Sequence, residues 1–223
     1  MPTSLVCISA SNIAHQPSQD STSFKICQIA IREASKILSD VQGAIIELKN
    51  KSIQPCAGCG ACFDSRRCAQ GDDFNSIYAE IIRADILLIV SPHYAPIPAK
   101  LSALLEKMEQ ITFLHWGRDP SYTSEVSGKP TGVISHGGGG QWALKSYKSM
   151  VNDTIANALD TIQLRLIPFD EEWNTGLSLP VKKAVFNDND IFPFQEYNWD
   201  CIGGAISAYV KRIAETVPGA AAL

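Results

Sequence analysis

The sequence predicts an α/β protein in which a parallel β-sheet is covered by helices on both faces. Short apolar segments alternate along the chain with longer segments of helical periodicity, which is the pattern of a parallel sheet with crossover helices. Some of the apolar segments lack polar alternation, as strands buried on both faces do. A hydrophobic content of 45% over 223 residues is enough for one large core.

The first strand is predicted at residues 5–8, which are apolar and lead into a polar loop at residues 9–20. The helix after this loop is indicated by apolar residues at helical spacing, namely Phe24, Cys27, Ile31, Ala34 and Leu38. Residues 44–48 are predicted to form the second strand.

The third strand, residues 86–90, is apolar throughout and is therefore expected inside the sheet. A helix precedes it, with Asp72 or Asp73 available as its N-terminal cap. The apolar face of that helix contains Ile77, Ile81 and Ala84. Pro98 suits the first turn of the next helix. That helix is predicted to bury Leu101, Leu104, Leu105, Met108 and Ile111.

Two further strands are predicted at residues 131–135 and 162–167. The helix between them is indicated by Leu144, Tyr147, Val151 and Ile155. A C-terminal helix is predicted to bury Ile202, Ile206, Tyr209, Ile213 and Val217.

Residues 169–197 do not fit the strand–helix repeat. They are rich in aromatic residues and contain Pro180 and Pro193. The segment is predicted to be a lid, a subunit contact or an ordinary insertion packed on its own domain. We therefore expect residues 1–223 to form a single domain with a cysteine-rich loop at 55–72 and this aromatic insertion.

Composition narrows the possible partners. The formal net charge is −4, so nucleic acid is not expected as a partner. No apolar stretch is long enough to span a bilayer, and the N-terminus lacks the basic region of a signal peptide. Clustered cysteines in a chain of this size indicate reduced thiols or metal ligands. These features predict a cytoplasmic protein without a membrane partner.

The ligand site of such a sheet is expected where the carboxyl ends of its strands meet. Three loops follow strands at that edge, at residues 9–20, 91–98 and 135–141. The first offers serines near a helix N-terminus, which favours a phosphate, although Ser21 could simply cap the helix. In the second, Tyr94 could lie against a planar ring or fill the core. The third contains four glycines, which suit close approach of a ligand or a flexible hinge.

Several of these motifs resemble those of the NADPH-dependent FMN reductase and iron–sulfur flavoprotein group. They are Ser9-x-Ser11, the helix start Ser21-Thr22, Ser91-Pro92-x-Tyr94 and the glycine loop, and the resemblance covers roughly residues 4–170. It implies a flavodoxin-like, doubly wound, five-stranded parallel sheet of order 2-1-3-4-5. It also implies FMN as cofactor, NAD(P)H as electron donor, and assembly as a homo-oligomer, either a dimer or a tetramer.

The resemblance also implies which residues hold FMN. The phosphate would lie on the hydroxyls after the first strand and at the helix start. The ring would lie against the loops after the third and fourth strands. No residue is expected to be catalytic. The expected FMN residues are Ser9, Ser11, Ser21, Thr22, Ser91, Pro92, His93, Tyr94, Ala95, Pro96, His136, Gly137, Gly138, Gly139 and Gly140.

Four of the seven cysteines are candidate metal ligands, namely Cys56, Cys59, Cys62 and Cys68. The close spacing of the first three is shared with ferredoxin-like sequences, and four thiolates are the ligands of a [4Fe–4S] cluster. Structural zinc is a second interpretation, although zinc sites usually pair two Cys-x2-Cys units across a longer gap. A third is that the four ligate nothing. Cys7, Cys27 and Cys201 are interpreted as structural.

The leading functional prediction is an FMN-dependent oxidoreductase. It would use NAD(P)H to reduce a small acceptor, such as a quinone or a flavin, or would transfer electrons to a redox protein. The first alternative is an iron–sulfur flavoprotein electron carrier with a [4Fe–4S] cluster. The second is a flavodoxin-like binding protein that has lost FMN. It is motivated by Ala10-Ser11-Asn12-Ile13, which stands where the family often has Gly-Ser-Pro-Arg.

Overall fold

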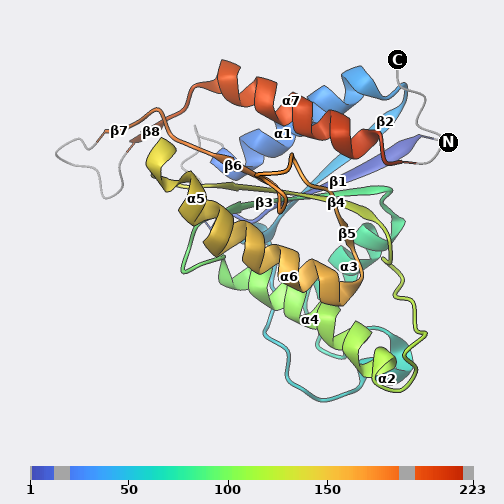
Figure 1. The fold of residues 1–223 in the computed structure, drawn as a ribbon. Helices are drawn as coiled ribbons and strands as arrows, with labels where there is room; N and C mark the ends of the chain where they lie inside the picture. Colours follow the sequence, from blue (N-terminus) through green and yellow to red (C-terminus); the bar gives the residue numbers. More distant parts are fainter. Residues whose placement is uncertain (1, 13–20, 186–193, 218–223) are drawn as a thin grey trace.

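The computed structural model describes residues 2–12, 21–185 and 194–217, and its centre is a parallel sheet (Figure 1). The order β2-β1-β3-β4-β5 confirms the predicted doubly wound topology. All pairings in this sheet are parallel. Its strands are β1 (Thr3–Ser9), β2 (Val41–Glu47), β3 (Ile86–Pro92), β4 (Pro130–His136) and β5 (Arg165–Leu166).

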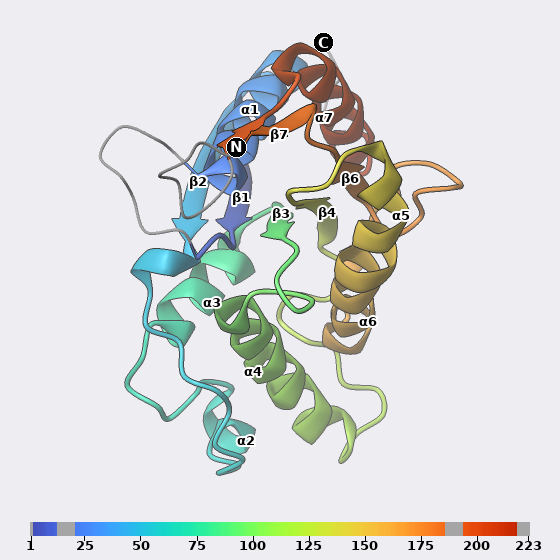
Figure 2. The same cartoon turned by 90° about the vertical axis from the view of Figure 1, so that its left-hand side faces the viewer.

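Helices cover both faces of the sheet (Figures 1 and 2). One face carries α1 (Thr22–Ile37) and α7 (Trp199–Ala214). The other carries α3 (Phe74–Arg83), α4 (Ala99–Trp116) and α6 (Asp153–Ile162). The shorter helical segments are η1 (Leu48–Asn50), α2 (Cys62–Ser65), η2 (Gln141–Ala143), α5 (Leu144–Tyr147) and the π-helix η3 (Lys148–Asn152).

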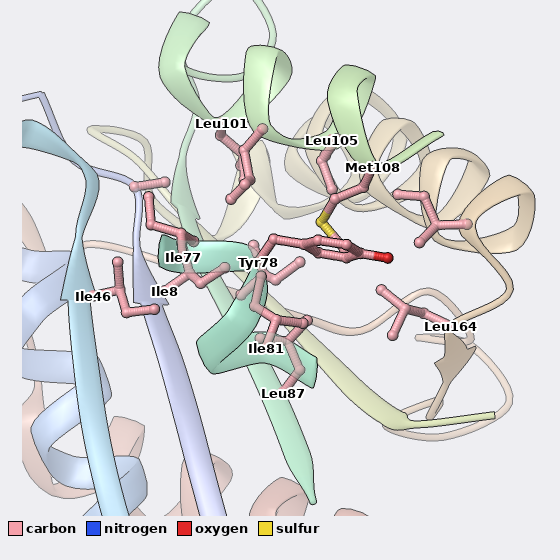
Figure 3. Close-up of a cluster of buried hydrophobic side chains, with 14 of the residues drawn as sticks. Ile8, Ile46, Ile77, Tyr78, Ile81, Leu87, Leu101, Leu105, Met108 and Leu164 are labelled. Carbon is pink, nitrogen blue, oxygen red and sulfur yellow. The ribbon is translucent and has the colours of Figure 1, made fainter. Parts of the chain in front are cut away.

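The core consists of two layers, one on each face of the sheet. Alternate residues of β1 enter opposite layers, because successive side chains of a strand point to opposite faces. Val6 and Ile8 pack with the α3, α4 and α6 layer, whereas Leu5 and Cys7 pack with α1 and α7. Figure 3 shows the first layer, in which Tyr78 lies among aliphatic side chains of strands and helices.

The predicted buried faces of α4 and α7 are confirmed. All five residues expected from α4 are buried, as are the four expected within α7, while Val217 lies beyond its end and is half-buried. In α1 the predicted face is wrong in part, since Phe24 and Ile31 are only half-buried. Helix α1 packs against α7 as well as against the sheet, so Ile26, Ile29 and Ala30 are buried instead.

The helix expected over residues 144–155 is not α-helical throughout. It runs through α5, η3 and α6, and the π-turn adds one residue between the two α-helical parts. Tyr147, Val151 and Ile155 are nevertheless buried as predicted.

The fifth strand is shorter than predicted, and part of the aromatic insertion joins the sheet. Helix α6 ends at Ile162 because Gln163 adopts a left-handed conformation, with φ 69°, which leaves only Arg165–Leu166 for β5. The remaining edge of β4 pairs with β6 (Leu177–Leu179), so the sheet has six strands. Strands β7 (Lys183–Val185) and β8 (Phe194–Glu196) form a separate antiparallel hairpin. Phe186 and Phe192 lie outside the described residues.

Among the helices that the structure describes, none combines the length and the apolar character that crossing a bilayer requires.

Candidate functional site

The loops after β1, β3 and β4 lie side by side at the carboxyl edge of the sheet. The Ala10 N–H donates to the Val90 carbonyl at 3.0 Å, and the His93 N–H donates to the His136 carbonyl at 2.9 Å. The structure thus brings together the described parts of the three loops predicted to bind a ligand. Residues 13–20 of the first loop lie outside the described part of the chain.

The expected phosphate residues gather around the N-terminus of α1. Ser9 and Ser11 are buried, and Ser11 shares a hydrogen bond with the Tyr94 hydroxyl. Ser21 is the N-cap, and its Oγ accepts from the Phe24 N–H at 3.3 Å. Thr22 hydrogen-bonds with the Tyr197 side chain. These hydroxyls, at the positive end of the α1 dipole, form a donor set that fits a phosphate.

The loop after β3 is held by hydrogen bonds between its own residues. The Ser91 Oγ donates to the Pro92 carbonyl at 3.0 Å, and the Tyr94 N–H donates to the Pro96 carbonyl at 2.9 Å. Ala95 has φ 48°, and the Ala95–Pro96 peptide is cis. Burial raises the pKa of Tyr94 more than its bond to Ser11 lowers it, so the hydroxyl is protonated at neutral pH.

The glycine loop, residues 137–140, needs glycine for close approach and not for positive φ. All four glycines are described, and none has positive φ. A Cβ at Gly137 would lie 2.6 Å from the Tyr147 Oη, and a Cβ at Gly139 would lie 2.4 Å from the Ala143 Cβ. Tyr147 was expected only as a core residue, so its place at this loop is a finding of the structure.

His136 joins the end of β4 to α1. Its Nε2 lies 2.7 Å from the Ser23 Oγ, and both side chains are buried. Burial lowers the pKa of His136 to about 3, so the ring is neutral at neutral pH. Within the described part of the chain, its Nδ1 has no hydrogen-bond partner. Ser23 was not among the expected residues, although it belongs to the same serine-rich stretch.

The four clustered cysteines line one hollow together with Lys107 and Gln110. Helix α2, which begins at Cys62, packs against α4 and lies well away from α5, the helix that follows the glycine loop (Figure 2). Burial raises the pKa of Cys62, and Cys56, Cys59 and Cys68 raise it further. Gly58 and Gly60 have positive φ and allow the tight turns between the thiols. Four cysteine thiolates are the donor set of an iron–sulfur cluster. Among the described residues, however, no group of three or more His, Cys, Asp or Glu has the arrangement of metal ligands.

Hydrogen bonds to neighbouring carboxylates and amides hold the cysteine segment. The Cys56 N–H donates to Glu106 at 3.0 Å, and the Cys68 N–H donates to Asn75 at 2.8 Å. Asp73 is the N-cap residue of α3, but its carboxylate accepts from the Ser52 N–H at 2.7 Å and makes no cap bond. The cap bond comes from Asp72, which accepts from the Phe74 N–H at 3.1 Å.

The three remaining cysteines differ from one another in exposure. Cys7 and Cys27 are buried, as predicted. Cys201, also interpreted as structural, is exposed and does not act as a small buried hydrophobe as the other two do. It lies in the first turn of α7 beside Ile202, which takes the buried side.

The sheet order and the position of the loops define the chain as a flavodoxin-like protein. A flavone reductase structure superposes with a TM-score of 0.61 at 12% identity, covering 97% of this chain and 64% of the other. The apo form of an NADH:FMN oxidoreductase superposes with a TM-score of 0.57 at 15% identity, covering 99% and 95%. The chain belongs to the NADPH-dependent FMN reductase family, whose sequence model matches residues 6–164.

Three curated relatives are iron–sulfur flavoproteins. The one from Methanosarcina thermophila is 36% identical over 61 residues, which are 27% of this chain and 32% of the relative. The one from Archaeoglobus fulgidus is 23% identical over 120 residues, which are 53% of this chain and 51% of the relative. The third, from Methanocaldococcus jannaschii, is 27% identical over 86 residues, or 45% of its length. The chain therefore spans about half or less of the relatives that it matches.

Proposed function

We propose that this protein is an FMN-dependent oxidoreductase that takes electrons from NAD(P)H. It would pass them to a small acceptor such as a quinone or a flavin, or to a redox protein. The observation that carries the proposal is the meeting of three loops at the N-terminus of α1, in a chain of the FMN reductase family. The distant similarity to named flavin oxidoreductases agrees with it.

The chain's own residues would bind and orient the cofactor. Ser9, Ser11, Ser21 and Thr22 would hold the phosphate at the positive end of the α1 dipole. The ring would lie against residues 91–96 and 136–140, with Tyr94 beside it. FMN, when bound, supplies hydride and single-electron chemistry. His136 is neutral at neutral pH, and the proposal requires no acid or base from the protein.

The FMN proposal is tested with a variant that keeps the helix cap but repels a phosphate. Aspartate caps helices as well as serine does, so Ser21→Asp should fold while placing a negative charge at the phosphate site. We expect FMN affinity to fall at least about tenfold. Riboflavin, which lacks the phosphate, should bind both proteins equally. Affinities are measured by quenching of flavin fluorescence.

Ser35→Asp is the matched control, because Ser35 is exposed on the same helix but lies near its other end. It should bind FMN as the wild type does. A wild-type protein that is colourless and takes up no added FMN would instead support a flavodoxin-like binding protein that has lost the cofactor.

A second candidate function is that of an iron–sulfur flavoprotein electron carrier. The observation that favours it is the single hollow lined by Cys56, Cys59, Cys62 and Cys68. The named relatives agree with it. A [4Fe–4S] cluster, when bound, supplies single-electron transfer. The chain would contribute the four thiolates, with Gly58 and Gly60 keeping side chains out of the turns between them.

Anaerobic purification followed by iron, sulfide and zinc analysis tests this candidate. We expect about four irons and four sulfides per chain. Cys59→Ser should lose them, whereas Cys201→Ser, which changes an exposed cysteine outside the hollow, should retain them. Zinc without sulfide would identify a structural zinc site, and the absence of all three would show that the cysteines ligate nothing.

Homo-oligomerisation, as a dimer or a tetramer, is also proposed. Trp142 is 83% exposed in the single chain. Its large apolar side chain is one that a second copy of the chain could cover. Light scattering of the purified protein measures the subunit number directly, and a monomeric mass would contradict the proposal.

A further inference from the structure

The glycine loop is held on two sides, by the helix that follows it and by the segment after β6. On one side, the Gly139 N–H donates to the Tyr147 Oη at 2.6 Å. On the other, the Val181 N–H donates to the Gly139 carbonyl at 3.0 Å. The Tyr197 Oη lies 3.2 Å from the Gly137 carbonyl oxygen and 2.9 Å from the Gln195 Oε1, so its single proton is shared between these two acceptors. The N–H and carbonyl of Gly139 and the carbonyl of Gly137 are thereby held by neighbouring groups.

The four glycines do not have equivalent surroundings. A Cβ at Gly137 would lie 2.6 Å from the Tyr147 Oη, and one at Gly139 would lie 2.8 Å from the same atom. At Gly140 the nearest atoms would be 3.7 Å away, an ordinary contact distance. Glycine at positions 137 and 139 is therefore explained by the space that the Tyr147 side chain occupies. These two glycines need no ligand to explain them.

Tyr147 also reaches the neighbouring loop after β3. Its ring centroid lies 5.7 Å from that of His93. Its side chain is buried, with 5% of the residue exposed. Burial raises the pKa of Tyr147 more than the bond from Gly139 lowers it, so the hydroxyl stays protonated at neutral pH. The ring thus lies between the two loops against which the flavin ring is proposed to bind.

We propose that Tyr147 and Tyr197 are positioning residues that fix the backbone of residues 137–140 in the conformation that receives the ring of FMN. The inference rests on the proposed function, because it concerns the same cofactor. It also gives the aromatic insertion a role. Through Val181 and Tyr197, the segment after β6 supports the loop from outside the sheet. Removal of the Tyr147 hydroxyl should loosen the loop, because the buried Gly139 N–H loses its partner. Removal of the Tyr197 hydroxyl should have a smaller effect, because Gly137 is only half-buried.

The test uses three variants: Tyr147→Phe, Tyr197→Phe and the double variant that combines them. Each is compared with the control variant Tyr122→Phe. Tyr122 is a matched control, because its hydroxyl has no hydrogen-bond partner among the described residues and it lies near the cysteine segment. Two quantities are measured: the hydrogen-exchange rates of the amides of residues 137–140 in FMN-free protein, and the FMN dissociation constant. We expect faster exchange at Gly139 and about tenfold weaker FMN binding in Tyr147→Phe. Tyr197→Phe should show a smaller change and Tyr122→Phe none.

Each outcome decides the inference. If the wild type binds FMN and Tyr147→Phe shows unchanged exchange and unchanged affinity, the inference is wrong while the proposed function stands. If the wild type binds no FMN, both are wrong. If Tyr147→Phe does not fold, Tyr197→Phe carries the test through the exchange rates of residues 137–140, because its hydroxyl also bonds with Thr22 and Gln195 and its FMN affinity reports on those contacts too. Unchanged exchange in a folded Tyr197→Phe would then overturn the inference. Equal weakening by Tyr122→Phe would point to a general loss of stability and would also overturn the inference.

Discussion

At the residue scale, His136 shows how burial decides the chemistry of a side chain. It stands at the end of β4, directly before the glycine loop, and contacts Ser23 of α1. An imidazole in this position would usually invite a catalytic interpretation. Because burial lowers its pKa to about 3, it carries no charge at neutral pH. Its role here is to join a strand end to the helix whose N-terminus is the proposed phosphate site.

We predict that His136 makes the protein less stable as the pH falls from about 6.5 toward 3. An unfolded histidine has a pKa near 6.5, so the unfolded chain takes up a proton in this window that the folded chain does not. The stability is therefore complete above pH 6.5 and is lost as the pH decreases. The expected slope is at most about 1.4 kcal/mol per pH unit.

His136→Gln removes the titrating group and keeps a polar side chain. The free energy of unfolding in urea, measured for both proteins between pH 7.5 and 5, should converge as the pH falls. Parallel curves for the two proteins would contradict the prediction.

At the element scale, a buried ion pair attaches the cysteine segment to α4. The Lys107 Nζ lies 2.5 Å from the Asp72 Oδ2, and the two side chains are only 2% and 5% exposed. Asp72 also accepts from the Gln54 N–H at 2.8 Å, so one carboxylate joins the start of the cysteine segment, the start of α3 and the middle of α4. Burial alone would raise the pKa of Asp72, but Lys107 and the two amides outweigh it and lower the pKa.

Lys107→Met should therefore destabilise the protein by about 3–5 kcal/mol, because it leaves a buried carboxylate without its cation. The double variant Asp72→Asn/Lys107→Met should recover much of the loss. Lys182→Met is the control, since its ion pair with Glu196 is exposed and should contribute less than about 1 kcal/mol. Urea unfolding measures all three. Equal losses for Lys107→Met and Lys182→Met would contradict the assignment.

At the scale of the whole molecule, strand β6 determines where the C-terminal fifth of the chain begins. Strand β6 pairs with the far end of β4, beyond the short β5, and leads into the segment that contains Val181. Gly176 permits this pairing: it has φ 121°, and a Cβ there would lie 2.3 Å from the Val133 carbonyl oxygen. No other residue type fits this approach without displacing backbone.

Gly176→Ala should thus destabilise the fold by at least about 2 kcal/mol, through the strained conformation and the contact with Val133. Gly204→Ala is the matched control, because Gly204 is exposed in α7 with open space around it. It should stabilise the protein by about 0.5–1 kcal/mol. In thermal unfolding, the midpoint of Gly176→Ala should fall and that of Gly204→Ala should rise. An unchanged midpoint for Gly176→Ala would show that β6 does not need the close contact between Gly176 and Val133.

The local sequence pattern predicted some strands and helices correctly and missed the ends or pairing of others. Residues 86–90 were expected to be buried on both faces, and they lie at the centre of the sheet. The apolar spacing of α4 predicted its whole buried face. The end of α6 was missed because Gln163, a residue with no strong local signal, adopts a left-handed conformation there. The pairing of β6 was missed because a strand of three residues is too short to show periodicity.

The order of strands and helices along the chain, most of their buried faces and the meeting of three loops at one edge were predictable from the sequence. These follow from periodicity along the chain and from the handedness of parallel crossovers, which are properties of neighbouring residues and of chirality. Only the tertiary structure decided that Tyr147 and Tyr197 hold the glycine loop, that His136 contacts Ser23 and that Lys107 pairs with Asp72. Most of these contacts join residues from 35 to 113 positions apart, so their partners depend on how the elements pack and not on any local pattern.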